Sequence, residues 1–362
     1  MQSLSQQTLN ELTLLIKQWG YDLGFQQVGI TDTELSSAED HLQQWLAKGF
    51  QGEMSYMSKH GLKRSRPELL HEGVVRVISV RMDYQTESAA MMTKVLQDQT
   101  SAYISRYALG RDYHKMMRNR LQKLADKIER ALSQLMPNDD FDLRMRGFVD
   151  SAPVLEKALA EKAGLGWIGK HSNVINRKAG SWFFLGELYI ALPLPIDEVA
   201  TNHCGACEAC IDICPTQAIV APYQVDARRC VSYLTIELQG TIPVEFRPLI
   251  GNRIYGCDDC QIICPWNRFA KLTAEADFNP RQQLNTSHLL AVFAWDEETF
   301  LVKTEGSAIR RIGYERWLRN IAVALGNAPT SDELITALRA RLNGASELVT
   351  EHLQWALAQH QL

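Results

Sequence analysis

All eight cysteines of the 362-residue chain lie between Cys204 and Cys264, and their spacing constrains the fold more than any other feature of the sequence. The first run, Cys204-Gly-Ala-Cys-Glu-Ala-Cys-Ile-Asp-Ile-Cys214-Pro, has the C-x2-C-x2-C-x3-C-P spacing of a bacterial ferredoxin loop that binds a 4Fe-4S cluster. The second run, Cys257-Asp-Asp-Cys-Gln-Ile-Ile-Cys264-Pro, has Ile254 where a regular motif would place its leading cysteine. Cys230 is the only cysteine left to supply the missing ligand.

In two-cluster ferredoxins the fourth cysteine of each run ligates the other cluster. Because this rule leaves no cysteine spare, both clusters are expected to carry electrons and not to bind a substrate at iron. The predicted ligands are Cys204, Cys207, Cys210 and Cys264 for cluster one, and Cys214, Cys230, Cys257 and Cys260 for cluster two. The alternative to iron-sulfur clusters is a set of disulfides or zinc sites, although the C-x3-C-P ending is not a zinc spacing. Cys230 has a further alternative, which is that it is an isolated buried thiol.

Length and composition predict two or three domains, since 46% of the residues are hydrophobic. The N-terminus has neither a signal-peptide pattern nor a twin-arginine pair, and no apolar run approaches the roughly 18 residues of a membrane-spanning helix. We therefore expect a cytoplasmic protein without a membrane partner, where reducing conditions suit iron-binding thiolates. The net charge of −4 argues against indiscriminate nucleic-acid binding but allows a local basic face.

Before the cysteines, helical and strand patterns alternate, which indicates an α/β or α+β domain. Helices are predicted at 8–19, 42–48, 118–135 and 154–163, and strands at 26–30, 74–80, 103–107 and 181–190. Asp150 follows an apolar segment and precedes a helix, so it is predicted to be either a helix cap or a proton donor whose pKa is raised by apolar neighbours.

After the cysteines the pattern is helical, with apolar positions at helical spacing in 307–326, 331–342 and 346–357. Short helices separated by tight turns are typical of helical repeats that stack into a concave surface. The first carries Arg310, Arg311, Arg316 and Arg319. These arginines lie either on a solvated helix face or at phosphate contacts, and Arg247 and Arg253 are candidates to line a path inward.

Taken with the cysteines, several segments make the chain resemble the epoxyqueuosine reductases, cobalamin-dependent enzymes of the last step of queuosine synthesis on tRNA. The resemblance extends over essentially the whole chain. It rests on Val149-Asp-Ser-Ala-Pro153, Gly166-Trp-Ile-Gly-Lys170, Ser181-Trp-Phe-Phe-Leu-Gly186, Val225-Asp-Ala-Arg-Arg-Cys230, Ser232-Tyr-Leu-Thr-Ile-Glu237, Gly251-Asn-Arg-Ile254, Cys257-Asp-Asp-Cys260 and Arg319-Asn-Ile-Ala-Val-Ala-Leu-Gly-Asn327.

The resemblance implies an α+β multidomain fold. Residues 1–195 would form an α/β cobalamin-binding catalytic domain, 196–270 a double 4Fe-4S ferredoxin-like domain, and 271–362 a HEAT-like helical domain that binds tRNA. The signature D-x-H-x-x-G of cobalt-ligating histidines is only half present, because Asp112-Tyr-His114 is followed by Met117 in place of glycine. This departure fits the base-off cobalamin of the family, so His114 is expected near the corrin and not on the cobalt.

The resemblance also implies site residues and a reaction. Corrin contacts are expected at Arg66, Tyr113, His114, Asp150, Ser172, Ser232, Gly256 and Asp258. An epoxide on the wobble base of a tRNA anticodon arm would become an alkene with loss of water, which consumes two electrons and two protons. Electrons would pass from a one-electron donor such as a flavodoxin or ferredoxin through both clusters to cob(I)alamin, the nucleophile. Asp150, kept protonated by an apolar wall, would be the catalytic acid of a monomeric enzyme.

Two other functions remain possible from the sequence. A cytoplasmic enzyme like the reductive dehalogenases shares base-off cobalamin and two clusters, but such enzymes carry a twin-arginine leader and usually lack a helical tail. A ferredoxin-type electron-transfer subunit would need only the cysteine region, and it leaves roughly 190 preceding residues without a purpose.

Overall fold

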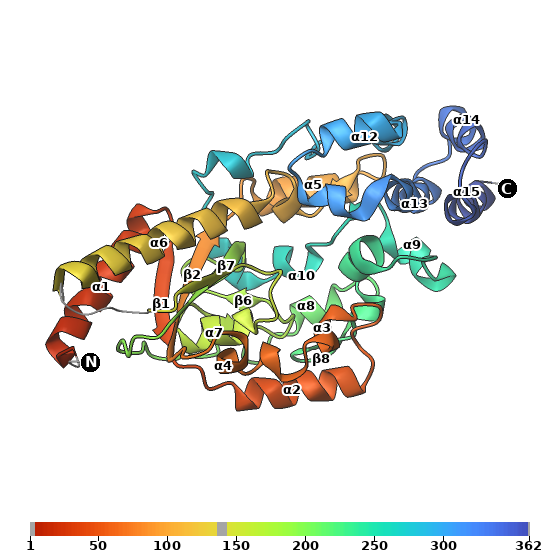
Figure 1. Cartoon of the computed structure of the whole chain (residues 1–362). Helices are drawn as coiled ribbons and strands as arrows, with labels where there is room; N and C mark the ends of the chain where they lie inside the picture. Colours follow the sequence, from red (N-terminus) through yellow and green to blue (C-terminus); the bar gives the residue numbers. More distant parts are fainter. Residues whose placement is uncertain (1–3, 136–142, 361–362) are drawn as a thin grey trace.

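The computed structural model describes residues 4–135 and 143–360, and its first half is built on one antiparallel sheet (Figure 1). The four strands lie in the order β1-β2-β7-β4. Their bounds are Gln27–Thr31 (β1), Arg76–Asp83 (β2), Phe183–Ile190 (β7) and Arg146–Phe148 (β4). Ile78 of β2 pairs with both Ile30 and Leu188, so β-branched and aliphatic residues form the centre of the sheet.

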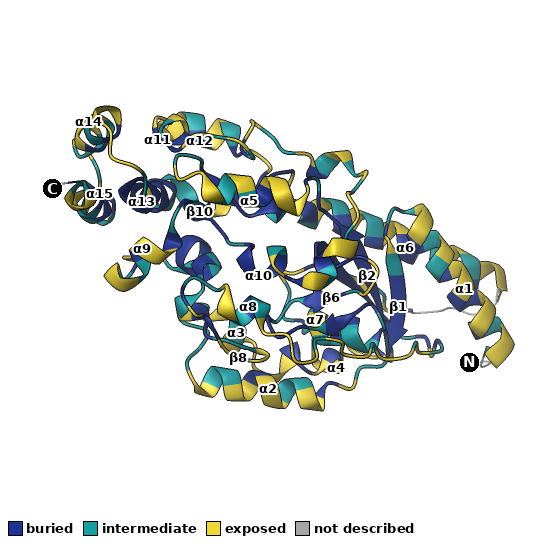
Figure 2. Cartoon of the chain, turned by 180° about the vertical axis from the view of Figure 1, so that it is seen from behind, coloured by how far each residue is buried: buried dark blue, intermediate teal, exposed yellow. Residues whose placement is uncertain are grey.

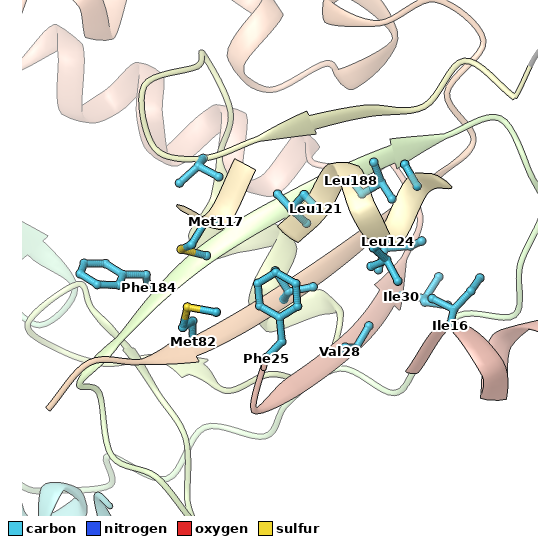
Figure 3. Close-up of a cluster of buried hydrophobic side chains, with 14 of the residues drawn as sticks. Ile16, Phe25, Val28, Ile30, Met82, Met117, Leu121, Leu124, Phe184 and Leu188 are labelled. Carbon is cyan, nitrogen blue, oxygen red and sulfur yellow. The ribbon is translucent and has the colours of Figure 1, made fainter. Parts of the chain in front are cut away.

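Helices α1 (Gln6–Asp22) and α6 (Tyr113–Leu135) cover one face of this sheet. Figure 3 shows Leu121 and Leu124 of α6 near Leu188 of β7, within the main hydrophobic core. Gly186 permits this close approach, because a Cβ there would lie 3.2 Å from Leu121. Helix α7 (Glu156–Lys162) covers the opposite face, where Leu159 packs with residues of β2 and β7.

The remaining elements of the first half are short and surround this layered core. They are α2 (Ser36–Ala47), α3 (Tyr56–Lys59), α4 (Pro67–Leu70), α5 (Ala89–Gln97), β3 (Tyr103–Ile104), β5 (Trp167–Ile168) and β6 (Val174–Ile175), with 3-10 helices at Gly61–Arg64 and Arg106–Ala108. Trp45 of α2 donates a hydrogen bond to the Val225 carbonyl, so this helix contacts the cysteine region.

The cysteine region consists of short elements joined by turns. These are α8 (Ala209–Asp212), β8 (Ile219–Ala221), β9 (Gln224–Val225), α9 (Arg247–Ile250), β10 (Arg253–Tyr255), α10 (Asp259–Ile262), a π-helix at Tyr233–Glu237, and 3-10 helices at Ala227–Arg229, Val244–Phe246 and Pro265–Phe269. No helix or strand lies between β7 and α8, among residues that the structure describes throughout.

The C-terminal helices pack around α13 (Gly313–Gly326), which is the most buried of them (Figure 2). The others are α11 (Leu289–Phe293), α12 (Glu297–Lys303), α14 (Asp332–Arg341) and α15 (Glu347–Gln359), with 3-10 helices at Ala276–Phe278 and Ala308–Ile312. Their core includes Ile104 and Tyr255, because β10 pairs in parallel with β3. These helices therefore share a core with residues from the first half of the chain.

The predicted helices and strands are present with shifted ends, except that the helical segment predicted at 307–326 is divided into the 3-10 helix Ala308–Ile312 and α13. The helix predicted at 118–135 begins at Tyr113, and the strand predicted at 103–107 turns into a 3-10 helix after Ile104. Helix α7 begins at Glu156 with Leu155 before it and has no side-chain cap, so the interpretation of Asp150 as a helix cap is wrong. Among the helices of residues 4–135 and 143–360, none is long and apolar enough to cross a membrane.

Candidate functional site

One large cavity, of about 1520 Å³, lies between the sheet, α2, the cysteine region and the segment before α13. Asp150 and Tyr113 line one part of its wall, Cys230 and Cys260 another, and Arg311 a third. Three parts of the chain that are far apart in the sequence therefore face the same space.

Asp150 lies on the loop between β4 and α7, and hydrogen bonds from the start of α6 fix its carboxylate. Its φ of 50° is in the left-handed region, which is costly for a residue other than glycine and is held by surrounding contacts. The Tyr113 hydroxyl donates to Asp150 Oδ2 over 3.0 Å, and His114 Nε2 lies 3.2 Å from the same oxygen. Tyr113 is held in turn by its ring, which stacks on Phe184 at 3.6 Å.

The protonation of Asp150 differs from the prediction. Burial alone would raise the pKa of Asp150, but hydrogen bonds from His114 and Tyr113, with the charges of His114 and Arg311, outweigh it and leave this pKa below its ordinary value. Burial lowers the pKa of His114, yet its hydrogen bonds to Asp112 and Asp150 raise it to about 9. At neutral pH the proton shared by the two side chains therefore lies on His114. The prediction that an apolar wall keeps Asp150 protonated is wrong.

The inner cysteine group, Cys214, Cys230, Cys257 and Cys260, lines the cavity with all four members. Burial raises the pKa of Cys260 well above its ordinary value, and the nearby thiols of Cys230 and Cys214 raise it further. Cys230 reaches this group because it ends the 3-10 helix Ala227–Arg229, whereas Ile254 is fully buried in the C-terminal core.

The outer cysteine group, Cys204, Cys207, Cys210 and Cys264, lies outside the cavity lining. Burial raises the pKa of Cys210 to about 11, and Cys264, Cys204 and Cys207 add to this shift. Cys207 is exposed, in contrast to every member of the inner group. The thiols of Cys264, Cys204 and Cys207 act on the pKa of Cys210, those of Cys230 and Cys214 act on the pKa of Cys260, and none of the eight cysteines forms a disulfide. The assignment of the two groups as cluster ligands stays a prediction.

Comparison with known proteins identifies the family. Residues 64–151 match the family described as Epoxyqueuosine reductase QueG, DUF1730, and residues 203–267 match the 4Fe-4S double cluster binding domain. The epoxyqueuosine reductase of Salmonella typhimurium is 61% identical to this chain, over 97% of this chain and 89% of its own length. The chain belongs to the epoxyqueuosine reductase family.

Solved structures of this family share the fold. An epoxyqueuosine reductase from Bacillus subtilis, in which the catalytic loop is swung out of the active site, is 25% identical with a TM-score of 0.83, covering 97% of this chain and 91% of that one. An epoxyqueuosine reductase bound to an epoxyqueuosine-modified tRNA stem loop is 24% identical with a TM-score of 0.81, covering 97% of this chain and 99% of that one. The predicted mixed α and β architecture with a double-cluster region is therefore confirmed for this family member.

The residues predicted to contact a cofactor do not all reach the cavity. Tyr113, His114, Asp150, Ser172, Ser232 and Asp258 line it. Arg66 lies outside the lining and pairs with Glu39 at 3.0 Å, whereas Arg64 lines the wall. Gly256 is also absent from the lining, and its N–H donates to Thr235 Oγ1 over 2.9 Å.

The four candidate arginines of the C-terminal region have different surroundings, and Arg316 is half-buried and donates to the carbonyls of Ile236 and Ile312. Arg310 and Arg311 line the cavity, and Arg311 pairs with Glu237 at the end of the π-helix. Arg319 is fully buried and donates to the carbonyls of Leu234, Leu238 and Gly240, so it is unavailable to a phosphate and does not lie on a solvated face.

The prediction for Arg247 and Arg253 is also wrong. Arg247 is 1% exposed and pairs with Glu351, while Arg253 pairs with Asp259. Neither lines the cavity, because both side chains hold segments of the cysteine region in place.

Two acids near Asp150 were missed by sequence reasoning. Burial raises the pKa of Glu156, which lines the cavity, to about 7, and the charge of Asp150 adds to this shift. Burial raises the pKa of Glu187 well above its ordinary value, and the nearby carboxyls of Glu156 and Asp150 add to this shift. For Glu187, the signal in the sequence was its position in the middle of an otherwise apolar strand, where burial of an unpaired charge is costly.

Proposed function

We propose that this chain reduces epoxyqueuosine to queuosine at the wobble position of tRNA, with base-off cobalamin in the cavity and electrons supplied through two 4Fe-4S clusters. The observation that carries this proposal is that a single cavity has the inner cysteine group on one wall and the Asp150–His114 pair on another. An electron route and a proton source thus meet where a substrate can react. Membership of the epoxyqueuosine reductase family supports the same conclusion.

The cavity fits cobalamin by size and by its hydrogen-bonding groups. Its volume of about 1520 Å³ exceeds the roughly 300–1,000 Å³ of pockets for drug-sized ligands, as a corrin with amide arms requires. His171 is 4% exposed on this wall, and its Nδ1 accepts the Asn173 N–H. Its Nε2 has no hydrogen-bond partner among the described residues, so it is placed to donate to a corrin amide oxygen.

His114 supports the base-off assignment. Its Nδ1 lies 2.6 Å from Asp112 and its Nε2 3.2 Å from Asp150, so both ring nitrogens are engaged and neither is free to bind cobalt. Tyr113, Ser172, Ser232 and Asp258 are the other proposed neighbours of the cofactor. Cobalamin, when bound, supplies a reducible and nucleophilic cobalt.

The cysteine groups support an electron route in two stages. We assign the first 4Fe-4S cluster to the outer cysteine group and the second to the inner cysteine group. The outer group includes the exposed Cys207, and the inner group lines the cavity. Electrons from a flavodoxin or ferredoxin would enter at the first cluster and leave at the second.

The proton route starts at His114. Opening an epoxide and releasing its oxygen as water requires two protons, and a negatively charged Asp150 has none to give. We propose that His114 Nε2 transfers its proton to Asp150 Oδ2 and that Asp150, on the cavity wall, passes it to the substrate oxygen. His114 then takes up a second proton from solvent, which the same relay delivers for release of that oxygen as water. Asp112, hydrogen-bonded to Nδ1, stabilises the imidazolium before the transfer.

The substrate is proposed to be a tRNA anticodon arm, whose single-stranded loop can present an unstacked base to a buried centre. Arg310 and Arg311 on the cavity wall are the proposed phosphate contacts, in place of the buried Arg319. The proposed domains are 1–195 for catalysis, 196–270 for the clusters and 271–362 as a HEAT-like tRNA-binding unit. We place the protein in the cytoplasm as a monomer.

The test is anaerobic purification from cobalamin-fed cells, followed by measurement of iron, cobalt and the modified nucleoside of a tRNA carrying epoxyqueuosine. We expect both metals and conversion to queuosine with a chemical reductant. Full iron content without bound corrinoid and without conversion would favour the ferredoxin-type subunit instead.

A further inference from the structure

Three exposed cations lie together beside the outer cysteine group. Arg177 and Lys178 occupy the turn between Asn176 and Gly180, and Arg268 follows Asn267. The two segments touch, because the Ser181 N–H donates to Asn267 Oδ1 over 2.6 Å and a Cβ at Gly180 would lie 3.0 Å from Asn267 Cα. We call Arg177, Lys178 and Arg268 the basic patch.

The basic patch carries unneutralised charge. Within residues 4–135 and 143–360, none of its three side chains lies within ion-pair distance of a carboxylate. The chain as a whole has a net charge of −4, so this local excess of positive charge runs against the overall balance. An exposed cluster of one sign attracts and orients a partner of the opposite sign.

An aromatic contact path connects this surface to the outer cysteine group. Phe269 is 39% exposed, and its ring lies 5.9 Å from that of Trp266. Trp266 lies 5.1 Å from Trp167, whose Nε1–H donates to Cys204 Sγ over 3.5 Å. Ile175, immediately before the cationic turn, packs in the same cluster as Cys204 and Cys264. The basic patch therefore borders the site assigned to the first iron-sulfur cluster.

We propose that the basic patch and Phe269 form the docking surface for an acidic protein that carries a flavin, and that this protein delivers electrons to the outer cluster. The proposal rests on the proposed cluster sites. Acidic side chains around the flavin would meet the three cations, and the apolar edge of the flavin ring would lie against Phe269 and Trp266. In each transfer one electron leaves the anionic flavin hydroquinone, which becomes the neutral semiquinone. The oxidised cluster gains that electron, and no proton has to move.

The experiment compares the intact chain with the charge-reversed variant R177E/K178E/R268E under anaerobic conditions. The measurement is the rate at which fully reduced, purified bacterial flavodoxin bleaches the visible absorbance of the clusters, over a series of salt concentrations. We expect at least a tenfold slower reduction at low salt, and a loss of most of the salt dependence. An unchanged rate would overturn the proposal.

A matched control separates docking from net charge. Lys123, Arg130 and Arg339 are exposed on α6 and α14, so K123E/R130E/R339E changes the net charge by the same amount away from the basic patch. We expect this control to be reduced at nearly the normal rate. Equal slowing in both variants would show that overall charge and not the basic patch controls the reaction.

A second reductant separates docking from damage to the clusters. Photoreduced 5-deazariboflavin is small and uncharged, so it should reduce both variants as fast as the intact chain. Low iron content in the intact chain would instead contradict the proposed cluster sites. If only the triple variant loses iron, the single variant R177E, on the exposed turn, is tested in place of the triple variant. Normal reduction of R177E by flavodoxin at all salt concentrations then overturns the proposal. Slowing with an acidic ferredoxin but not with flavodoxin also overturns it.

Discussion

Each of the two cysteine groups consists of four thiols, but the surroundings of the two groups differ. Every member of the inner group faces the cavity that also contains Asp150 and His114, whereas the outer group includes the exposed Cys207 and adjoins the aromatic rings of Trp167 and Trp266. The potential of an iron-sulfur cluster depends on solvent exposure and on hydrogen bonds to sulfur. In the proposed electron route, the outer group therefore receives electrons and the inner group delivers them.

The largest expected effect comes from removing an inner ligand. Cys230→Ala leaves the inner group with three thiols, because Ile254 is buried in another core and no other cysteine is spare. We expect iron content to fall toward roughly half, or a three-iron species, with loss of tRNA reduction while the outer cluster is still reduced by deazaflavin. Iron analysis and electron paramagnetic resonance measure these changes. Retention of eight irons per chain would show that Cys230 is only a buried thiol.

The next largest effect is expected at the acid that faces the cavity. Asp150→Asn replaces the carboxylate that Tyr113 and His114 contact with an amide, which cannot relay a proton, and loss of a general acid typically slows turnover by roughly 10² to 10⁴. Both clusters, cobalamin and tRNA should still bind, because Asp150 is not a metal ligand in our assignment. Single-turnover conversion of modified tRNA gives the rate. Turnover close to normal would remove Asp150 from the chemistry.

His114 predicts a pH dependence of intermediate size. Its pKa is raised to about 9, so the imidazolium that supplies the proton is present below that pH and is lost as the pH rises through it. The single-turnover rate should therefore decrease above about pH 9 in the intact chain. His114→Gln should be slower at neutral pH and should lack this decrease, while reduction of both clusters stays normal. An unchanged pH profile in His114→Gln would exclude the relay.

The double-cluster region was predictable because spacing within a short motif encodes cluster ligation, and residues 203–267 match the 4Fe-4S double cluster binding domain. Crossover between the two runs followed from the same rule, and the structure gathers Cys214 and Cys230 with the second run. Helices such as α6 and α15 were also predictable, since their apolar positions repeat at helical spacing.

Predictions that depend on distant partners were the ones that failed. The ionisation of Asp150 depends on His114 and Tyr113, which α6 brings across the sheet, so no pattern around residue 150 reports it. The sequence around Arg319 is that of an ordinary helix. Its side chain is nevertheless fully buried, and it donates to the Leu234 and Leu238 carbonyls at the π-helix. Composition shows that a charge exists, but only tertiary contacts decide whether it is solvated, paired or neutral.

The smallest expected effect tests the outer group in isolation. Trp167→Phe keeps an aromatic ring against Trp266 but removes the Nε1–H that donates to Cys204 Sγ over 3.5 Å. A hydrogen bond to sulfur stabilises the more negative, reduced cluster, so its loss should lower the potential of the outer cluster and leave the inner one unchanged. The expected shift is below about 59 mV, the value of a tenfold change in a one-electron equilibrium. A redox titration followed by electron paramagnetic resonance resolves the two clusters, and Trp295→Phe, in the C-terminal region, serves as the control. A shift confined to the inner cluster would reverse the assignment of the two groups, because the Trp167 Nε1–H donates to Cys204 of the outer group.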